Sequence, residues 1–178
     1  MMLKAKVFAC KSGYIMVMAL MILLVLSILG AAIIQVGGME FKTSHYNYLT
    51  HQAQQGTDAG VEWTMEKIYQ ELKMEQYADE VTLPATLSFG NPTALIIGTD
   101  SCTITINTIT RLEQTSQVGE NACTYRFTST GTFGNAARTA TVQVKYKFSG
   151  GYYSTQNGTQ VFITRSNFGR GNIISYLQ

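Results

Sequence analysis

The sequence contains few residues of the kinds that carry out chemistry. Its two histidines, His45 and His51, are six residues apart, and on a helix this spacing turns their side chains roughly 120° away from each other. They therefore do not form a two-ligand metal face. The chain also lacks a Gly-x-Ser-x-Gly elbow, a phosphate-binding glycine loop with lysine and a His-Glu-x-x-His helix. These absences predict a protein that is not an enzyme and has no catalytic, cofactor or metal site.

Charged residues are also scarce, at 13% of the chain. The formal net charge of +2 is misleading, because three of the thirteen basic residues, Lys4, Lys6 and Lys11, precede Tyr14. The rest of the chain has ten basic and eleven acidic residues and is close to neutral. A near-neutral surface gives no electrostatic case for nucleic acid or an acidic substrate as a partner.

One uncharged run stands out near the N-terminus. Tyr14 to Ile34 carries no charge, and Ser27 is its only strongly polar side chain. At ~1.5 Å per residue, a helix of this length spans the ~30 Å of a bilayer's hydrocarbon core. Lysines precede the run and acidic residues do not, so the positive-inside bias places the N-terminus in the cytoplasm. We expect everything after Gln35 to be exported.

Two ordinary interpretations fit this run. A cleaved secretory signal has an apolar core of ~7–15 residues and a small-residue cleavage site; here the run is longer, and Gly30-Ala31-Ala32 is only a weak site. A permanent single-pass anchor fits the length equally well. The junction of Lys11-Ser12-Gly13 with Tyr14 favours a third interpretation, because a basic leader ending in glycine meets an aromatic residue and then aliphatic ones.

This junction resembles the type III signal of type IV pilins and pseudopilins, which is cut after the glycine on the cytoplasmic face. Further along, Met39-Glu40, Gln52-Ala53 and the Thr57 to Glu62 segment resemble the pattern of PilX-type pilus assembly proteins, which are minor pilins. The resemblance covers about residues 11 to 68.

The resemblance implies a set of partners and a location. Prepilin peptidase cuts between Gly13 and Tyr14, and the chain sits in the bacterial inner membrane as a single-pass protein with its head in the periplasm or, in a pilus, outside the cell. Its partners are membrane lipid, the inner-membrane assembly platform and other pilin subunits, which it contacts through the N-terminal helix. Tyr14 stands where phenylalanine is usual, a difference that bears on N-methylation more than on cleavage.

One departure from the family pattern concerns the fifth residue after the cut. Most major pilins have glutamate there, and in the filament it pairs with the α-amine of a neighbouring subunit, because a lone charge in apolar surroundings is costly. This chain has Met18 instead. The absence favours a minor, tip-proximal subunit over a bulk filament subunit. The alternatives are a pseudopilin of type II secretion, where the K-type also lacks this glutamate, and a membrane-anchored or pilus-displayed adhesin.

The fold expected is α+β and type IV pilin-like: a long N-terminal membrane-spanning helix packed at its C-terminal half on an antiparallel sheet. Apolar residues at three- and four-residue spacings define the packing face, and Gly37-Gly38 predicts a kink or local melting. The expected segments are a leader (1–13), a transmembrane and filament-core helix (14–36), an exported amphipathic helix (37–78), a loop (79–101) and a β-sheet head with a polar tail (102–178).

Strand patterns follow the loop. Alternation predicts strands at Thr103–Ile109, Tyr125–Ser129 and Ala140–Phe148, with turns at 117–121 and 131–135, which together make an antiparallel meander. Cys102 and Cys123 both fall in the exported part, and a pair of cysteines in an oxidising compartment predicts a disulfide worth about 3 kcal/mol. The alternative is two buried thiols.

Overall fold

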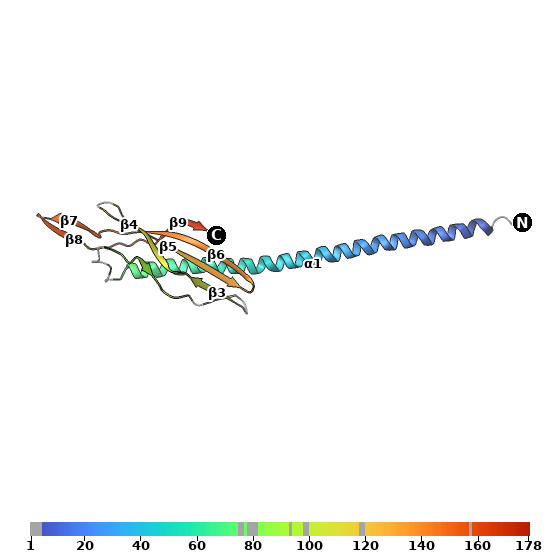
Figure 1. Cartoon of the computed structure of the whole chain (residues 1–178), viewed down its shortest axis with the longest axis horizontal. Coiled ribbons are helices and arrows are strands. Elements are labelled where there is room, and N and C mark those ends of the chain that lie inside the picture. The colour runs from blue at the N-terminus through green and yellow to red at the C-terminus, as the bar shows by residue number, and fades with distance from the viewer. Residues whose placement is uncertain are drawn as a thin grey trace. The chain divides into compact units, whose positions relative to one another are not determined.

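The structure is a computed structural model and describes residues 5–74, 77, 82–92, 94–97, 100–117, 120–156 and 158–178. The chain divides into two compact units, Met1–Asn47 and Tyr48–Gln178. The described residues form one long helix and nine strands (Figure 1). Their bounds are α1 (Ala5–Leu72), β1 (Thr86–Leu87), β2 (Leu95–Ile97), β3 (Asp100–Ile106), β4 (Ile109–Gln117), β5 (Glu120–Phe133), β6 (Ala136–Lys147), β7 (Tyr152–Gln156), β8 (Thr159–Ile163) and β9 (Asn172–Leu177).

The helix α1 is continuous through its glycine pair. The predicted kink or melting at Gly37-Gly38 is wrong, because both residues are helical. Two glycines cost roughly 2 kcal/mol of helix propensity, but ending a helix there and starting a new one would also cost a second nucleation. Propagation through the pair is the cheaper course. The helix ends at Leu72, and residue 78, the predicted end, lies outside the described residues.

Strand β5 is the centre of the main sheet. It pairs antiparallel with β6 along its length, from Ala122 opposite Lys147 to Phe133 opposite Ala136. The turn predicted at 131–135 is therefore too long, since residues 131–133 belong to β5. Strand β9 then pairs antiparallel with β6 and extends the sheet on that side.

Two strands share the other edge of β5. Strand β4 pairs with its first half, to Thr110 opposite Arg126, and β3 pairs with its second half, from Ile106 opposite Ser129. Both run antiparallel to β5, so β3 and β4 follow one another along a single edge. The antiparallel meander is thus confirmed, but two strands, β3 and β4, lie end to end where the first predicted strand was expected. Strand β4 was not predicted.

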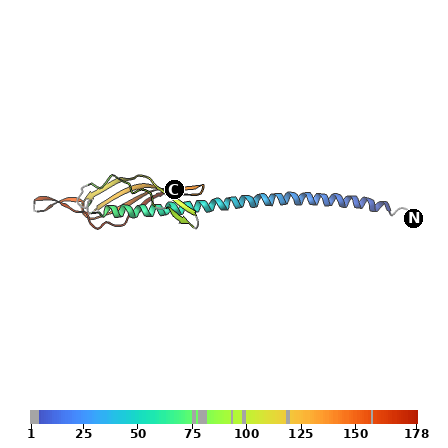
Figure 2. The ribbon, with the colours of Figure 1, turned by 90° about the horizontal axis from the view of Figure 1, so that it is seen from below.

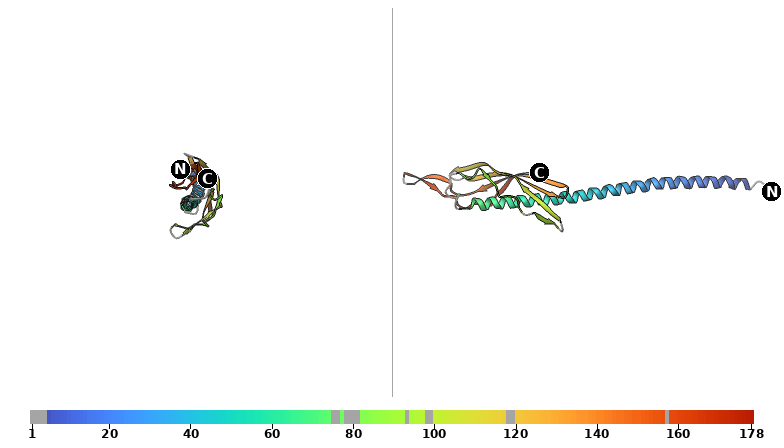
Figure 3. Two further views of the ribbon diagram at one scale, coloured as in Figure 1. Left: turned by 90° about the vertical axis from the view of Figure 1, so that its left-hand side faces the viewer. Right: turned by 60° about the horizontal axis from the view of Figure 1, so that its bottom comes forward.

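The C-terminal half of α1 packs on one face of this sheet. The left panel of Figure 3, which looks along the helix, shows the helix beside the strands. The predicted apolar face of β6 is confirmed, since its alternate residues are buried together with the following phenylalanine. The predicted helix face is buried or half-buried. The α+β arrangement expected from the sequence is therefore confirmed. The shared core contains Val61, Ile68, Leu72, Tyr125, Phe127, Ala140, Val142, Val144, Tyr146 and Phe148.

Small residues bring α1 close to the sheet. A side chain at Gly56 would overlap the Cys102 sulfur, and one at Gly60 would overlap Ser129 and Ile104. Both glycines are buried in the helix–sheet contact. This pair of glycines therefore serves close packing of the helix on the sheet.

Polar groups fix the same contact. The Ser129 hydroxyl donates a hydrogen bond to the Thr57 carbonyl oxygen (2.9 Å), and the Gly131 amide donates to the Thr57 hydroxyl oxygen (3.0 Å). The Thr57 hydroxyl oxygen also lies 2.8 Å from the Arg138 carbonyl oxygen. Because these groups are buried or partly buried, the bonds favour one register of helix on sheet.

The predicted Cys102–Cys123 disulfide is wrong. Both cysteines are free and buried. Cys102 precedes Thr103, which lies opposite Thr132 near the end of β5, whereas Cys123 lies near the start of β5. Nine strand residues separate these positions by about 30 Å, and a bridge needs Cα atoms within about 7 Å. The end-to-end arrangement of β3 and β4 along β5 causes this separation.

The tail after β6 holds three strands. β7 and β8 pair antiparallel in a two-stranded sheet of their own, drawn in orange-red (Figure 2). β9 is an edge strand of the main sheet, and the Tyr176 hydroxyl bonds to the Asp58 carboxylate of α1. The polar tail expected from the sequence thus contains a separate hairpin and one edge strand of the main sheet.

Candidate functional site: the apolar segment of α1

The apolar segment of α1, residues 14–36, is exposed in this chain. Exposure of its large side chains runs from 48% at Met18 to 78% at Ile34. One 18-residue window has a mean hydropathy of 3.0 with none of it buried, and α1 is the one described helix that is long and apolar enough to cross a membrane. A contiguous apolar surface of this size needs a cover that the chain itself does not provide, either lipid or other apolar helices.

The Ser27 hydroxyl, in the middle of the run, is satisfied locally. The Ser27 hydroxyl donates to the Leu23 carbonyl oxygen four residues earlier, at 2.9 Å. This bond removes the cost of an unpaired polar group in an apolar environment. Gly30, three residues later, has no atom within 4 Å of where a Cβ would stand. Ser27 can therefore lie against lipid or a close neighbour without an unpaired hydroxyl.

The predicted cleavage junction lies inside α1. The helix begins at Ala5, so both Gly13 and Tyr14 have helical backbones and both are exposed. No atom lies within 4 Å of where a Cβ of Gly13 would stand, so packing within the chain does not require glycine there. The helical conformation of this junction was not predicted from the sequence. A peptidase that acts on an extended backbone would first have to unwind it.

Met18 lies one helical turn after Tyr14, on the same side of the helix. Its side chain is one of the less exposed of the segment, but still nearly half exposed. No carboxylate precedes Glu40 in the sequence. The segment therefore offers no counter-charge for an amine, whichever face a neighbour approaches.

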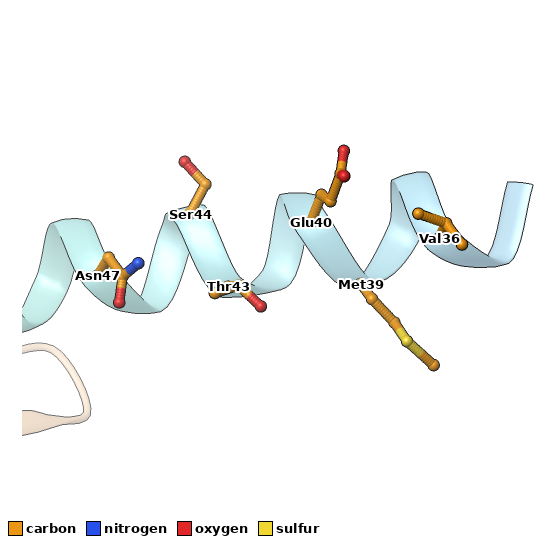
Figure 4. A pocket seen from close by; sticks show the side chains of 6 residues that line it. All are labelled: Val36, Met39, Glu40, Thr43, Ser44 and Asn47. Carbon is orange, nitrogen blue, oxygen red and sulfur yellow. The ribbon is translucent and has the colours of Figure 1, made fainter. Parts of the chain in front are cut away.

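Polar side chains begin where the apolar segment ends. Figure 4 shows Glu40 and Ser44 pointing to one side of α1 and Met39 to the other. This stretch borders a shallow hollow of about 450 Å³ on the helix surface, lined by Val36, Met39, Glu40, Thr43, Ser44 and Asn47. The change from apolar to mixed side chains marks one boundary of the segment that a membrane could cover.

His45 and His51 are exposed, and the described part of the chain has no group of three His, Cys, Asp or Glu side chains placed to hold a metal ion.

An exposed apolar N-terminal segment, together with an amphipathic helix packed on an antiparallel sheet, defines a pilin-like protein. The family comparison agrees with this class. The PilX N-terminal family model matches residues 12–62, so this part of the chain is similar to the N-terminal part of PilX-type pilins and supports a pilin related to type IV pili. That family consists of structural subunits, and the apolar helix fits a membrane-anchored pilin. No curated protein and no solved structure matches the chain.

Proposed function

We propose that this chain is a minor pilin-like subunit that takes part in type IV pilus assembly, at or near the tip. One observation carries the proposal: an apolar segment that stays exposed in the folded chain begins at the junction where the PilX match also begins. A subunit of this kind uses the same surface twice, first against lipid and later against other pilin helices. It needs no catalytic group of its own.

The exchange between lipid and filament is consistent with the composition of the segment. Lipid tails are about as apolar as leucine, so moving the helix into a bundle gains little hydrophobic free energy. Packing and the assembly platform must then supply the driving force. Ser27 keeps its bond to the Leu23 carbonyl oxygen in either environment because that bond lies within the helix.

Processing releases the segment for this use. In the proposal the N-terminus is cytoplasmic, and prepilin peptidase cuts between Gly13 and Tyr14, which leaves a new amino group on Tyr14. Glycine at the junction lowers the cost of unwinding, since it is about 1 kcal/mol less favourable than alanine in a helix. The product is residues 14–178, with the head on the periplasmic side.

Met18 supports the tip position. A subunit with glutamate at this place accepts the amine of a neighbour, whereas Met18 accepts none. The amine of Tyr14 can still pair with a glutamate supplied by another pilin. A subunit with Met18 can therefore form the amine–carboxylate pair with a neighbour on one side only. A subunit at the end of a filament likewise has a neighbour on one side only.

The test is deletion of the gene, complementation with the full chain, and a count of surface pili by electron microscopy. We expect deletion to remove most pili, complementation to restore them, and the chain to appear in sheared pili. Unchanged pili with the chain confined to the cell membrane would contradict the proposal. Unchanged pili combined with lost protein secretion would favour the pseudopilin alternative.

The adhesin alternative has one observation in its favour. Tyr153 of β7 is 56% exposed and lies edge-on to Phe162 of β8, with ring centroids 5.2 Å apart. This hairpin is outside the main sheet, so it can change without loss of the core. Tyr153→Ser with Phe162→Ser should leave the number of pili unchanged; loss of adhesion by these piliated cells would support an adhesin.

A further inference from the structure

The outer face of the sheet and the exposed side of α1 carry opposite charge. We propose that the outer basic face in one copy binds the acidic row of α1 in a second copy of this chain. The outer basic face is Arg126, Lys145 and Lys147; the acidic row is Asp58, Glu62 and Glu66. The inference rests on the proposed function, because assembly into a pilus brings heads side by side.

The outer basic face lies on the side of the sheet away from α1. Arg126 is opposite Gln143, and Lys145 and Lys147 are opposite Thr124 and Ala122. Their neighbours along β5 and β6 are the buried core residues, so alternation turns these three side chains outward.

Short hydroxyl side chains surround the basic residues. Thr128 and Thr141 are 3.2 Å apart between their hydroxyl oxygens, and Thr130 and Thr139 are 3.0 Å apart. Glu113 of β4, opposite Thr124, is a carboxylate on the same face. The face is therefore low in relief. Among its described side chains, three cationic groups stand against this one carboxylate, and a helix could lie on it.

The acidic row follows one line on α1. Asp58, Glu62 and Glu66 are exposed and four residues apart, so their carboxylates repeat about every 6 Å along the helix. Like charges at this spacing disfavour a helix slightly. Lys67, which is next to the row, lies over the Trp63 ring at 5.6 Å.

Neighbouring groups shape the row without covering it. The Gln70 amide donates to Glu66 at 2.7 Å, and the Tyr176 hydroxyl bonds to Asp58. A hollow of about 460 Å³ beside the row is lined by Glu62, Met65, Glu66, Tyr69, Arg170 and Gly171. A lysine side chain from a second copy could place its apolar stem against Met65 and Tyr69 and its ammonium beside the carboxylates.

The two surfaces match in spacing as well as in sign. Alternate residues of a strand repeat about every 6.6 Å, so the ammonium groups of Lys145 and Lys147 are spaced much like the carboxylates of Glu62 and Glu66. A contact between two copies of the same face would instead oppose like charges. The favoured contact is therefore heterologous, so two copies joined in this way leave one outer basic face and one acidic row for contact with other subunits.

Crosslinking between two differently tagged full-length copies tests the contact. One copy carries Glu62→Cys and the other Lys145→Cys, and a short bis-maleimide is added to piliated cells. Native Cys102 and Cys123 are buried, and a pair of copies without new cysteines measures their background. Two matched controls are Glu62→Cys in both copies, and Thr132→Cys, an exposed outer-face residue of the same strand pair, in place of Lys145→Cys.

We expect crosslinked dimer about tenfold above both controls. A yield for the Glu62→Cys and Lys145→Cys pair no higher than that of the control pairs, or crosslinks only to another pilin, would overturn the inference. The amino-terminal residue of the same sample separates the two proposals. With Tyr14 at the terminus, a failed crosslink refutes this contact alone; with Met1 at the terminus, the proposed function has failed.

Charge exchange gives a second test. Lys145→Glu with Lys147→Glu should lower incorporation into pili about tenfold, because attraction becomes repulsion. Adding Glu62→Lys and Glu66→Lys to the same chain exchanges both surfaces and should restore incorporation. Arg138→Glu is the matched control, since Arg138 is exposed but lies opposite Gly131 on the α1 side. No recovery in the fourfold variant would contradict the contact.

Discussion

The Tyr146 hydroxyl donates a hydrogen bond to the Met65 carbonyl oxygen at 3.0 Å. This bond joins the core strand β6 to the middle of the head part of α1, and the Tyr146 ring is fully buried against the Tyr125 ring in an edge-on contact. The helix is thus attached to its own sheet by packing and by a specific bond. The apolar segment, by contrast, keeps its large side chains 48–78% exposed, which is why its cover must come from lipid or other subunits.

Removal of that hydroxyl tests how much the bond contributes. Tyr146→Phe should lower the free energy of unfolding by about 1 kcal/mol, whereas Tyr146→Ala should lower it by about 3–5 kcal/mol because a cavity is added. Urea denaturation of the detergent-solubilised protein measures both. Tyr153→Phe, at an exposed position, serves as the control with no expected change. If both variants lost the same free energy of unfolding, packing of the Tyr146 ring would contribute nothing beyond the hydrogen bond, which would contradict the account.

Glycine at position 60 is required by contact. Gly60→Ala should destabilise the head by about 1–3 kcal/mol, because the new methyl group overlaps Ser129 and Ile104. Gly38→Ala is the matched control: it is also helical, nothing lies within 4 Å, and it should be neutral or stabilising by up to about 1 kcal/mol. Thermal unfolding followed by circular dichroism measures both. A stabilised Gly60→Ala protein would show that the helix does not approach the sheet this closely.

The buried thiols predict a pH dependence. Burial raises the pKa of Cys123 from 9.0 to about 12, against smaller opposing effects of Arg165 and Arg111, and burial also raises the pKa of Cys102. The unfolded chain therefore releases these protons first, so the stability due to the protonated thiols is complete below about pH 9 and is lost as pH rises toward 12. Burial raises the pKa values of Tyr125 and Tyr146 as well, so the decline steepens above their ordinary value of 10.0.

Urea midpoints measured between pH 8 and pH 10 check this dependence. The native protein should lose stability above about pH 9, and Cys123→Ala, less stable throughout, should show a shallower decline over this interval. A midpoint independent of pH in the native protein would contradict buried, protonated thiols. Alkylation of unfolded protein without reductant gives the companion result: both Cys102 and Cys123 should react, which a disulfide would prevent.

Met18 gives a prediction about position in the filament. Met18→Glu supplies a carboxylate for the amine of a neighbouring subunit and should raise the number of copies per pilus, moving the chain from the end into the shaft. Met16→Glu is the control, because it adds the same charge to the same exposed segment at another angle of the helix. Quantitative mass spectrometry of sheared pili counts the copies. Equal counts for the two variants would refute the tip argument.

The sequence predicted the sheet face that follows a strict period. Ala140, Val142, Val144 and Tyr146 alternate with polar residues, and all four are fully buried. Strand β4 was missed because Ile109–Gln117 has only two aliphatic residues and its register shifts between Arg111 and Glu113. A shifted register breaks the alternation on which a strand prediction depends.

The sequence did not predict which residues, far apart along the chain, lie next to each other in the fold. The predicted disulfide rested on the oxidising compartment and on the presence of two cysteines in the exported part. Neither fact reveals that β3 and β4 lie end to end along β5. The bonds of Thr57 to Ser129 and Gly131 were likewise missed, since they join residues more than seventy positions apart. The apolar segment was recognised because its signal is local: length, absence of charge and the residues at its junction are read directly from consecutive positions.

Substitution of Gly13 tests whether unwinding of the helix at the junction limits the rate of cleavage. Gly13→Ala should slow processing about fivefold, because alanine makes unwinding about 1 kcal/mol more costly. Gly30→Ala, also helical and without contacts, is the control and should be processed at the normal rate. Pulse-labelling followed by separation of precursor and product measures the rate. Faster processing of Gly13→Ala would show that the helix at the junction does not limit cleavage.

The most direct measurement is the intact mass and amino-terminal residue of this chain recovered from sheared pili. The account predicts a chain that begins at Tyr14 and ends at Gln178, with free thiols at Cys102 and Cys123. A chain that still begins at Met1, in cells whose other pilins are processed, would contradict it.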